Sequence, residues 1–278
     1  MLTKKTIGFL GSGNLAEALI KGLLSSGSVN ANQIMASDVA SERLAYMAGT
    51  YDIKVSNNNA DTAHNSEIIL LTIKPKDIKE ALVSCAQEID PDKLIISAAA
   101  GTTTQTIQRH LTVPKRRRMP RIVRAMPNTP AMVRAGVTAL CAGAGASTAD
   151  LNLAKAIFDS VGTTLTVDDE RLLDVVTGLS GSGPAYVFLF MESLAEAGIA
   201  SGLSASAARL LAVQTTLGAA TLALESPLML DELRRMVASP GGTTIEGLKI
   251  LDKGHFKETV IKAVGAASRR ATEIANGK

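Results

Sequence analysis

The chain has 278 residues and a net charge of +3, with 46% hydrophobic and 20% charged residues, a balance typical of a globular protein with one large domain or two smaller ones. The weak net charge and the 3% of aromatic residues argue against electrostatic and base-stacking contacts with nucleic acid. Cys85 and Cys141 lack metal-ligand spacing, and we find neither an apolar run of about 18 residues nor a signal-peptide layout, which argues against a metal centre, a disulfide framework, a membrane span and secretion.

The first half of the chain alternates short apolar runs with helical patterns. The predicted strands are 6–10, 33–37, 67–72, 93–98 and 122–126, and the predicted helices are 14–25, 41–48, 76–85 and 103–111. Continuous apolar strands are typical of a parallel sheet covered on both faces. Strand–helix alternation with right-handed crossovers predicts an α/β, doubly wound Rossmann domain.

Two further strands, at 137–142 and 163–167, flank a predicted helix at 150–160, and beyond residue 167 the strand signal disappears. The remaining segments are helical: 171–178, 185–202, 204–225, 230–237, 244–252 and 256–275. We therefore place a domain boundary near residue 167, between a Rossmann domain at 1–167 and a helical domain at 168–278. The alanine-rich helices could form a bundle alone or with another subunit. The basic run Lys115–Arg118 precedes its strand, and we interpret it as a solvated loop at the opposite sheet edge.

A glycine pattern follows the first predicted strand and opens the first helix. Gly11, Gly13 and Ala16 form G-x-G-x-x-A, in which the first glycine makes a turn, the second lets the backbone approach a pyrophosphate, and the small third residue lets helix and strand pack closely. The helix start supplies N–H donors to the phosphates. A chance tight turn is the alternative, but the placement favours a nicotinamide dinucleotide.

The choice between NADH and NADPH depends on the end of the second predicted strand, where Ser37 and Asp38 lie. An acidic residue there holds a ribose diol and repels a 2′-phosphate, so Asp38 favours NADH. The alternative is that Asp38 only caps a turn or helix, and the nearby Arg43 could offset its charge.

Three other strand ends have small or rigid sequences, and cofactors bind at the carboxyl ends of strands in such sheets. Lys74 stands where a nicotinamide ribose would pass, unless it is only a solvated lysine before a helix. Residues 99–101 are small enough for a flat ring to approach, and two prolines bracket Asn128 in a rigid loop suited to positioning a polar group.

The helical half holds two glycine-rich segments, 177–186 (TGLSGSGPAY) and 239–244 (SPGGTT). Each is predicted to present backbone amides at a helix start, which would bind an anion. The alternative for each is a connector between helices. The two glycines and two threonines of the second segment exceed what a connector needs.

With these two segments, the chain resembles the pyrroline-5-carboxylate reductases over essentially its whole length. The resemblance rests on GFLGSGNLAEALIKG near the start, IKP at 73–75, SAAAG at 97–101, RAMPNTPAMV at 124–133, TGLSGSGPAYVF at 177–188, QTTLGAA at 214–220 and SPGGTTIEGL at 239–248. It implies a Rossmann domain followed by an all-helical dimerisation domain, and reduction of 1-pyrroline-5-carboxylate to L-proline by NADH or NADPH. It also implies a homodimer through the helical domain, assembling into a larger ring such as a decamer. The cysteine usage and the lack of a signal-peptide layout separately predict a reducing compartment, the cytoplasm.

The resemblance and the motifs together assign site residues. We predict cofactor contacts from the glycine segment and the strand ends: Leu10, Gly11, Ser12, Gly13, Asn14, Leu15, Ala16, Ser37, Asp38, Asn59, Thr72, Ile73, Lys74, Pro75, Ala99, Ala100, Gly101 and Asn128. The predicted substrate residues are Glu170, Ser182, Gly242, Thr243 and Thr244, and the predicted catalytic residues are Thr244 and Lys74.

A mechanism that fits these residues needs no strong protein acid, because a free imine is basic enough to be protonated in water. The site must supply position and electrostatics. The amides of Gly242 to Thr244 would bind the substrate carboxylate, the Thr244 hydroxyl would donate to the ring nitrogen, and Lys74 and Asn128 would orient the nicotinamide end. Glu170 could approach the substrate nitrogen, although an exposed helix-start glutamate is an equally good interpretation.

Two other functions are compatible with a Rossmann domain followed by helices. A β-hydroxyacid dehydrogenase would need a catalytic lysine on a long central helix, and residues 185–202 and 204–225 contain no lysine. A non-catalytic dinucleotide sensor could share the fold, but it would not need the SPGGTT segment.

Overall fold

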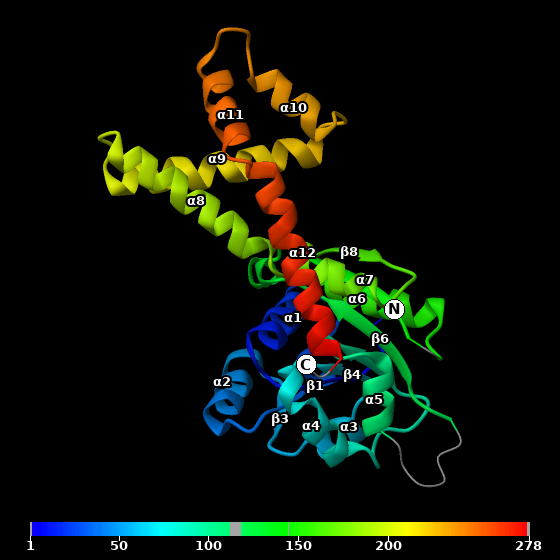
Figure 1. Ribbon diagram of the computed structural model, residues 1–278. Helices are drawn as coiled ribbons and strands as arrows, with labels where there is room; N and C mark the ends of the chain where they lie inside the picture. The colour runs from blue at the N-terminus through cyan, green and yellow to red at the C-terminus, as the bar shows by residue number, and fades with distance from the viewer. Residues whose placement is uncertain (1, 112–117, 144, 277–278) are drawn as a thin grey trace. The chain divides into compact units, whose positions relative to one another are not determined.

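Figure 1 shows the computed structural model, which describes residues 2–111, 118–143 and 145–276. By its internal packing the chain divides into two compact units, one formed by Met1–Ser182 with Ala266–Lys278 and the other by Gly183–Gly265. We call them the sheet unit and the helical unit. Residues 168–182 belong to the sheet unit, so the boundary between the two compact units lies after residue 182 and not at residue 167. The boundary between functional domains that the sequence predicts at residue 167 stays a prediction.

The sheet unit is built on one eight-stranded sheet of order β3-β2-β1-β4-β5-β6-β7-β8. All neighbouring pairs are parallel except β6 with β7, which confirms the predicted doubly wound architecture. The strands are β1 (Ile7–Leu10), β2 (Ile34–Ser37), β3 (Lys54–Ser56), β4 (Ile68–Leu71), β5 (Leu94–Ser97), β6 (Arg121–Met126), β7 (Gly136–Ala142) and β8 (Gly162–Thr166). The chain order reverses between β1 and β4, and this switch point is where such sheets bind ligands.

Helices cover both faces of the sheet, as the strands of continuous apolar residues predict. Ile68 and Leu70 of β4 pack in a core cluster with α1 (Asn14–Ser25), α2 (Ser41–Tyr51) and α6 (Thr148–Phe158). Ile69 and Leu71 of the same strand pack in a second cluster with α3 (Asn59–His64), α4 (Ile78–Cys85) and α5 (Thr104–His110). Alternate residues of one strand therefore supply two cores.

Two elements were missed at the sequence level, and one pairing was not foreseen. β3 spans three residues, none of them fully buried, and α3 spans six, so neither has a continuous apolar run or a long helical period. β6 and β7 are joined by the short 3₁₀ turn η3 (Thr129–Val133), which is too short for a parallel crossover, so β7 runs antiparallel to β6.

The helical unit contains α8 (Gly183–Ala200), α9 (Ala205–Glu225), α10 (Leu230–Val237) and α11 (Thr243–Lys253), together with the start of α12 (Phe256–Ala275), whose residues from Ala266 on belong to the sheet unit. α8 and α9 pack against each other through small residues: a Cβ added at Gly198 would lie 3.1 Å from the Ala208 Cβ. Ser204 begins α9 by accepting a hydrogen bond from the Ala207 N–H, as predicted.

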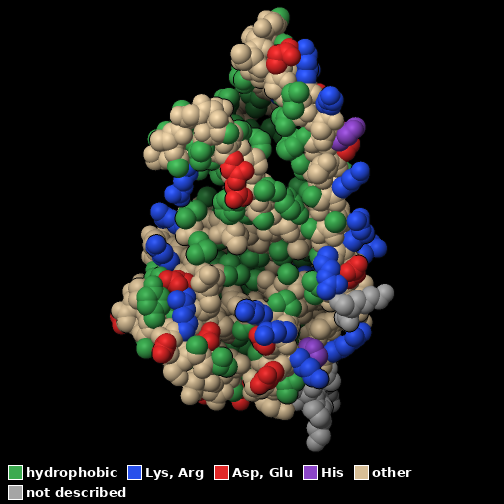
Figure 2. Space-filling view, turned by 60° about the vertical axis from the view of Figure 1, so that its left-hand side comes forward, with side chains coloured by type: hydrophobic (Ala, Val, Ile, Leu, Met, Phe, Trp, Pro, Cys, Tyr) green, Lys and Arg blue, Asp and Glu red, His purple; other side chains and the backbone are tan. Residues whose placement is uncertain are grey.

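Large apolar side chains remain exposed on the helical unit. α8 contains no buried residue, and the exposed apolar residues include Phe188, Leu189, Leu210 and Leu217. Figure 2 shows hydrophobic side chains gathered over these helices. By length and composition alone, the segments Leu172–Ala200 and Ala205–Glu225 could span a membrane. Both polar and charged residues interrupt their apolar runs, and for this reason the sequence pattern did not predict them.

Candidate dinucleotide and substrate site

The glycine loop is tied to the strands on both sides of β1. Gly11 donates its N–H to the Ser37 carbonyl of β2 at 2.8 Å, and the Thr72 hydroxyl after β4 donates to the carbonyls of Leu10 and Gly11 at 3.1 and 2.7 Å. Gly11 has a φ of +93°, and a Cβ there would lie 2.5 Å from Cγ2 of Ile73. Only glycine fits this turn.

The second glycine leaves room above the start of α1. Gly13 is the N-cap of this helix, and a Cβ at Gly13 would meet nothing within 4 Å. Asn14 and Leu15 follow in the first turn, where backbone N–H groups point out of the helix. Ala16 is fully buried in the core. The three positions therefore provide the turn, the open approach and the close packing that a bound pyrophosphate requires.

Asp38 is held against the glycine loop. Its carboxylate accepts the Ser12 N–H at 2.8 Å and the Ser12 hydroxyl at 3.0 Å, and it also accepts the Ala40 N–H at 3.0 Å. Burial by itself would raise the pKa of Asp38, but these hydrogen bonds hold the pKa below its usual value. The carboxylate is therefore ionised at neutral pH. The Arg43 Nε donates to the Ser12 carbonyl at 2.6 Å from the other side of the loop.

Ser37 and Asn59 form a hydrogen-bonded pair at the end of β2. The Ser37 hydroxyl donates to the Asn59 Oδ1 at 2.7 Å, and the Asn59 Nδ2 donates to the Ser84 hydroxyl at 3.3 Å. Ser37 is fully buried. Ser37 thus lies at the predicted strand end, and Asn59, the first residue of α3, is hydrogen-bonded to it.

A cavity of about 290 Å³ joins two of the predicted strand ends to the start of α1. Its lining includes Asn14 and Leu15 of α1, Ala98 after β5, Asn128 after β6, and Gly181. The Asn128 Oδ1 accepts the Val137 N–H at 2.9 Å, which holds the loop between β6 and β7 in place. We take this cavity, beside the glycine loop, as the candidate reaction site.

Lys74 and Gly101 border a larger cleft of about 970 Å³, whose lining also includes Thr103, Arg109 and His110. Lys74 is exposed and precedes the 3₁₀ turn η2 (Pro75–Asp77). Gly101 has a φ of +69°, and a Cβ there would lie 2.7 Å from Cγ2 of Ile274 in α12. The structure therefore places Lys74 in the wall of this cleft, and not in the lining of the smaller cavity.

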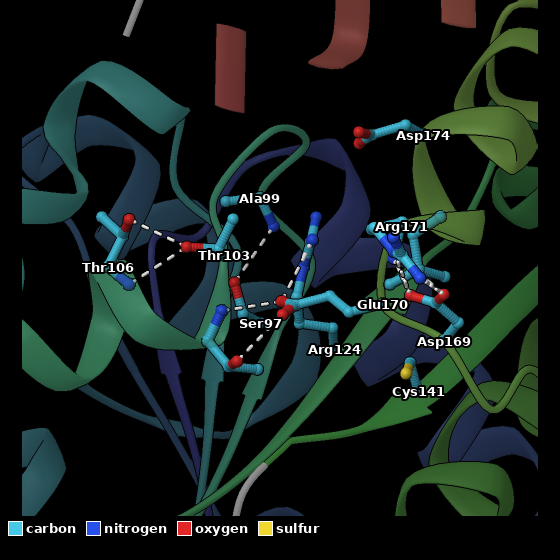
Figure 3. A network of polar contacts seen from close by, with 12 residues as sticks. Ser97, Ala99, Thr103, Thr106, Arg124, Cys141, Asp169, Glu170, Arg171 and Asp174 are labelled. Carbon is cyan, nitrogen blue, oxygen red and sulfur yellow. Dashed lines mark hydrogen bonds and ion pairs between the residues drawn. The ribbon is translucent and has the colours of Figure 1, made fainter. Parts of the chain in front are cut away.

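Glu170 makes hydrogen bonds that the sequence did not reveal. Its carboxylate accepts the Thr104 N–H at 2.7 Å, the Thr104 hydroxyl at 3.0 Å and Arg124 NH1 at 3.2 Å. Figure 3 shows Glu170 beside Arg124. Arg124, flanked by apolar residues within β6, was a usable signal, because a buried charge needs a partner.

The segment TGLSGSG is not a loop, which corrects the sequence interpretation. After α7 (Leu172–Val176), Thr177–Gly181 form a π-helical turn that leads directly into α8. The Ser182 N–H donates to the Thr177 carbonyl at 2.8 Å, so this amide is used within the turn. The small residues permitted a wide turn, and π-turns are frequent at functional sites.

The segment SPGGTT does form a helix start, as predicted. Gly242 is the N-cap of α11, which begins at Thr243, one residue earlier than expected. Gly241 has a φ of +73°, and a Cβ at Gly242 would lie 2.5 Å from the Ser239 hydroxyl oxygen. Both glycines are therefore required by the backbone path that presents Thr243 and Thr244 in the first helical turn.

The basic run has been placed only in part. Residues 115–117 lie outside the described residues, and Arg118 forms an exposed ion pair with Asp92. This pair lies before β5 and β6, at the sheet edge opposite the glycine loop.

A glycine loop at the switch point of a parallel sheet, with a helical unit after it, defines a Rossmann-type, nicotinamide-dinucleotide-dependent oxidoreductase. The family model described as NADP oxidoreductase, coenzyme F420-dependent, matches residues 6–101. The model for pyrroline-5-carboxylate reductase dimerisation matches residues 170–274.

Full-length relatives name the family. The pyrroline-5-carboxylate reductase of Pseudomonas aeruginosa is 41% identical over 97% of this chain and 96% of its own length. A solved pyrroline-5-carboxylate reductase from Coxiella burnetii is 38% identical, with a TM-score of 0.90 over 98% of this chain and 99% of that one. The Plasmodium falciparum pyrroline carboxylate reductase, solved with NADP bound, is 28% identical with a TM-score of 0.86 over 98% of both chains. This chain belongs to the pyrroline-5-carboxylate reductase family.

Proposed function

We propose that this chain reduces 1-pyrroline-5-carboxylate to L-proline with NADH or NADPH as the hydride donor, in proline biosynthesis. The main support for this proposal is the full-length match to the family, at 41% identity over 97% of the chain. The cavity beside the glycine loop supports the proposal, because it joins the ends of β5 and β6 to the start of α1. A small cyclic imine requires a compact reaction site of this kind.

The sheet unit binds the dinucleotide in this proposal. The open start of α1 at Gly13, Asn14 and Leu15 binds the pyrophosphate through backbone N–H groups. Residues 98–101 and Asn128 face the nicotinamide, and Lys74 orients its ribose. The bound cofactor supplies the hydride that reaches the imine carbon.

The helical unit binds the substrate. The N–H groups at the start of α11, from Gly242 to Thr244, receive the carboxylate. The Thr244 hydroxyl hydrogen-bonds to the ring nitrogen. It donates to the nitrogen of the neutral imine and accepts the N–H of the protonated imine, which keeps the ring oriented for hydride transfer. Thr243 adds a further substrate contact in this proposal, and Ser182, which belongs to the sheet unit, is proposed as another. We assign residues 1–167 to the dinucleotide domain and 168–278 to the dimerisation and substrate domain.

Asp38 makes NADH the preferred donor in this proposal. Its carboxylate is ionised and fixed at the end of β2 by Ser12 and Ala40. A fixed negative charge there accepts ribose hydroxyls and repels a 2′-phosphate.

The dimerisation region supports a homo-oligomer formed through the helical domain. We propose that these dimers assemble into a ring such as a decamer, and that the protein is cytoplasmic. A partner subunit, and not lipid, then covers the exposed apolar residues of α8 and α9.

The proposed reaction is tested by following NADH and NADPH absorbance in parallel with 1-pyrroline-5-carboxylate. We expect oxidation of both cofactors and proline as the product, and oxidation of neither would refute the function. Thr244→Ala should lower kcat by roughly 10- to 100-fold without changing cofactor affinity. Thr244→Ser should recover most of the rate, because the hydroxyl is retained. Wild-type kinetics for Thr244→Ala would remove Thr244 from the mechanism.

A further inference from the structure

Arg124 is a charged residue inside the sheet. It lies in β6 with its side chain only 4% exposed, and its register partners on the neighbouring strands are Ser97 of β5 and Cys141 of β7, both buried. The Arg124 Nε has no hydrogen-bond partner among the described residues. A guanidinium in such a place is stable only with a fixed counter-charge.

Glu170 supplies this counter-charge. It thereby connects its own segment and the start of α5 to β6. One carboxylate oxygen receives Arg124 NH1 and the Thr104 N–H, and the other receives the Thr104 hydroxyl. Three donors from two elements therefore converge on one side chain, which comes from a third segment between β8 and α7. Charge-assisted bonds to both oxygens leave the carboxylate little freedom to move.

Thr104 begins α5 and directly follows the loop that borders the candidate reaction site. This loop, residues 98–103, begins at Ala98, which lines the 290 Å³ cavity and donates its N–H to the Leu71 carbonyl at 3.1 Å. Ala100 packs on the buried cluster that includes Met126 and Cys141. The loop is thus fixed at its start by the sheet, in its middle by apolar contacts, and at its end by Glu170.

A second part of the cavity wall, at Gly181, is connected to the same carboxylate. Glu170 directly precedes the segment that forms α7 and the π-turn, and this turn ends at Gly181, which lines the cavity together with Ala98. A Cβ at Gly181 would lie 2.7 Å from the Met126 Cε, so this wall packs on β6 two residues beyond Arg124. One ionic cluster therefore ties both parts of the wall to β6.

We propose that Glu170, Arg124 and Thr104 form a positioning unit that sets the 98–103 loop, and through it the angle at which the nicotinamide ring faces the imine. Glu170 acts through Thr104 and Arg124, and it does not touch the substrate. This role rests on the proposed reductase function and replaces the substrate contact that the sequence suggested for Glu170.

The chain offers a matched control in the neighbouring carboxylate. Asp169 ion-pairs with the exposed Arg171 at 2.6 Å, and Figure 3 shows this pair beside Glu170. Asp169→Asn removes the same charge from the same segment without affecting the 98–103 loop.

The test compares Glu170→Gln and Asp169→Asn in the full-length protein. The affinity for ADP-ribose, which lacks the nicotinamide, measures binding of the adenine half of the cofactor. The fluorescence emission of bound NADH reports the surroundings of the nicotinamide ring. The chain has no tryptophan, so energy transfer from tryptophan does not contribute to this emission. For Glu170→Gln we expect ADP-ribose affinity within about twofold of wild type, altered NADH emission, and kcat lowered roughly 10- to 100-fold, the cost of a small misplacement. Asp169→Asn should match wild type in all three measurements.

A second variant separates positioning from charge compensation. Arg124→Met combined with Glu170→Leu removes both charges of the ion pair and should recover the midpoint of thermal unfolding if Glu170→Gln lowers it. Because Thr104 still lacks its acceptor, kcat should stay low.

The proposal would be overturned by wild-type kcat and emission in Glu170→Gln, by an equal loss of ADP-ribose and NADH affinity, or by recovery of kcat in the double variant. A raised substrate KM with unchanged kcat would place Glu170 on the substrate and would also overturn it. If the wild-type protein showed no reductase activity, the proposed function would fail, while the comparison of ADP-ribose with NADH emission would still test the positioning unit.

Discussion

The two units of this chain differ in how they bury apolar side chains. In β4 of the sheet unit all four residues are buried, because helices cover both faces of the sheet. In α8 of the helical unit no residue is buried, and Phe188 and Leu189 are 62% and 63% exposed. The sheet unit closes its core within one chain, whereas the helical unit carries a surface that requires another molecule.

The largest expected effect comes from placing a charge on that surface. Leu217 of α9 is 56% exposed in the single chain. Leu217→Asp should weaken dimer formation at least roughly 100-fold, because an unpaired carboxylate buried at an interface costs about 3 kcal/mol or more. Light scattering on a dilution series would measure the change.

A substitution of similar exposure in the sheet unit provides the control. Val83 of α4 is 59% exposed, and Val83→Asp should leave the assembly unchanged because α4 faces solvent there. Equal effects of the two substitutions would contradict the distinction between the units.

A second prediction sharpens the description of the sheet unit, where neighbouring glycines have different roles. Gly11→Ala should lower the free energy of unfolding by about 2–3 kcal/mol, since its φ is +93° and the new Cβ would clash with Ile73. In Gly13→Ala the new Cβ has no neighbour within 4 Å, so the free energy of unfolding should stay within about 0.5 kcal/mol of wild type. Chemical denaturation would measure both.

Both glycine variants should bind ADP-ribose at least roughly tenfold more weakly, because each disturbs the approach of the pyrophosphate. Calorimetric titration would measure this loss. Normal binding by Gly13→Ala would show that the space above Gly13 is not the pyrophosphate path.

The smallest effect concerns the charge of Asp38. Asp38→Asn should raise the NADPH-to-NADH ratio of kcat/KM by about tenfold, corresponding to about 1.4 kcal/mol of removed repulsion. Asp90→Asn, in the turn before β5, is the control. An unchanged ratio in Asp38→Asn would show that Asp38 does not select the cofactor.

The same pair of proteins tests the ionisation of Asp38. Hydrogen bonds hold the pKa of Asp38 in the folded protein below the ordinary value of 3.8. The ionised carboxylate therefore stabilises the fold at pH values above 3.8. This stabilisation is lost as the pH falls through the lowered pKa. The stability of wild type relative to Asp38→Asn should therefore decline only below about pH 4, as urea denaturation across pH would show.

Strong local patterns allowed much of the fold and site to be predicted. α1 was predicted with its observed bounds, and the strand ends at Ala98 and Asn128 do meet at one cavity. Short or polar elements such as β3 were missed because they lack periodicity. The π-turn at Thr177–Gly181 was taken for a loop, since glycine and serine are compatible with both.

The sequence by itself determined the strand–helix alternation, the glycine turn and the family, because these depend on local periodicity and on residue types at fixed spacing. Only the tertiary structure decided that Glu170 binds Thr104 and Arg124, which lie 66 and 46 residues away, and that Asp38 is fixed by Ser12. Such contacts depend on the order and register of the strands. A helix surface rich in apolar residues can be read from the sequence, but only the folded chain shows that its own residues leave that surface exposed.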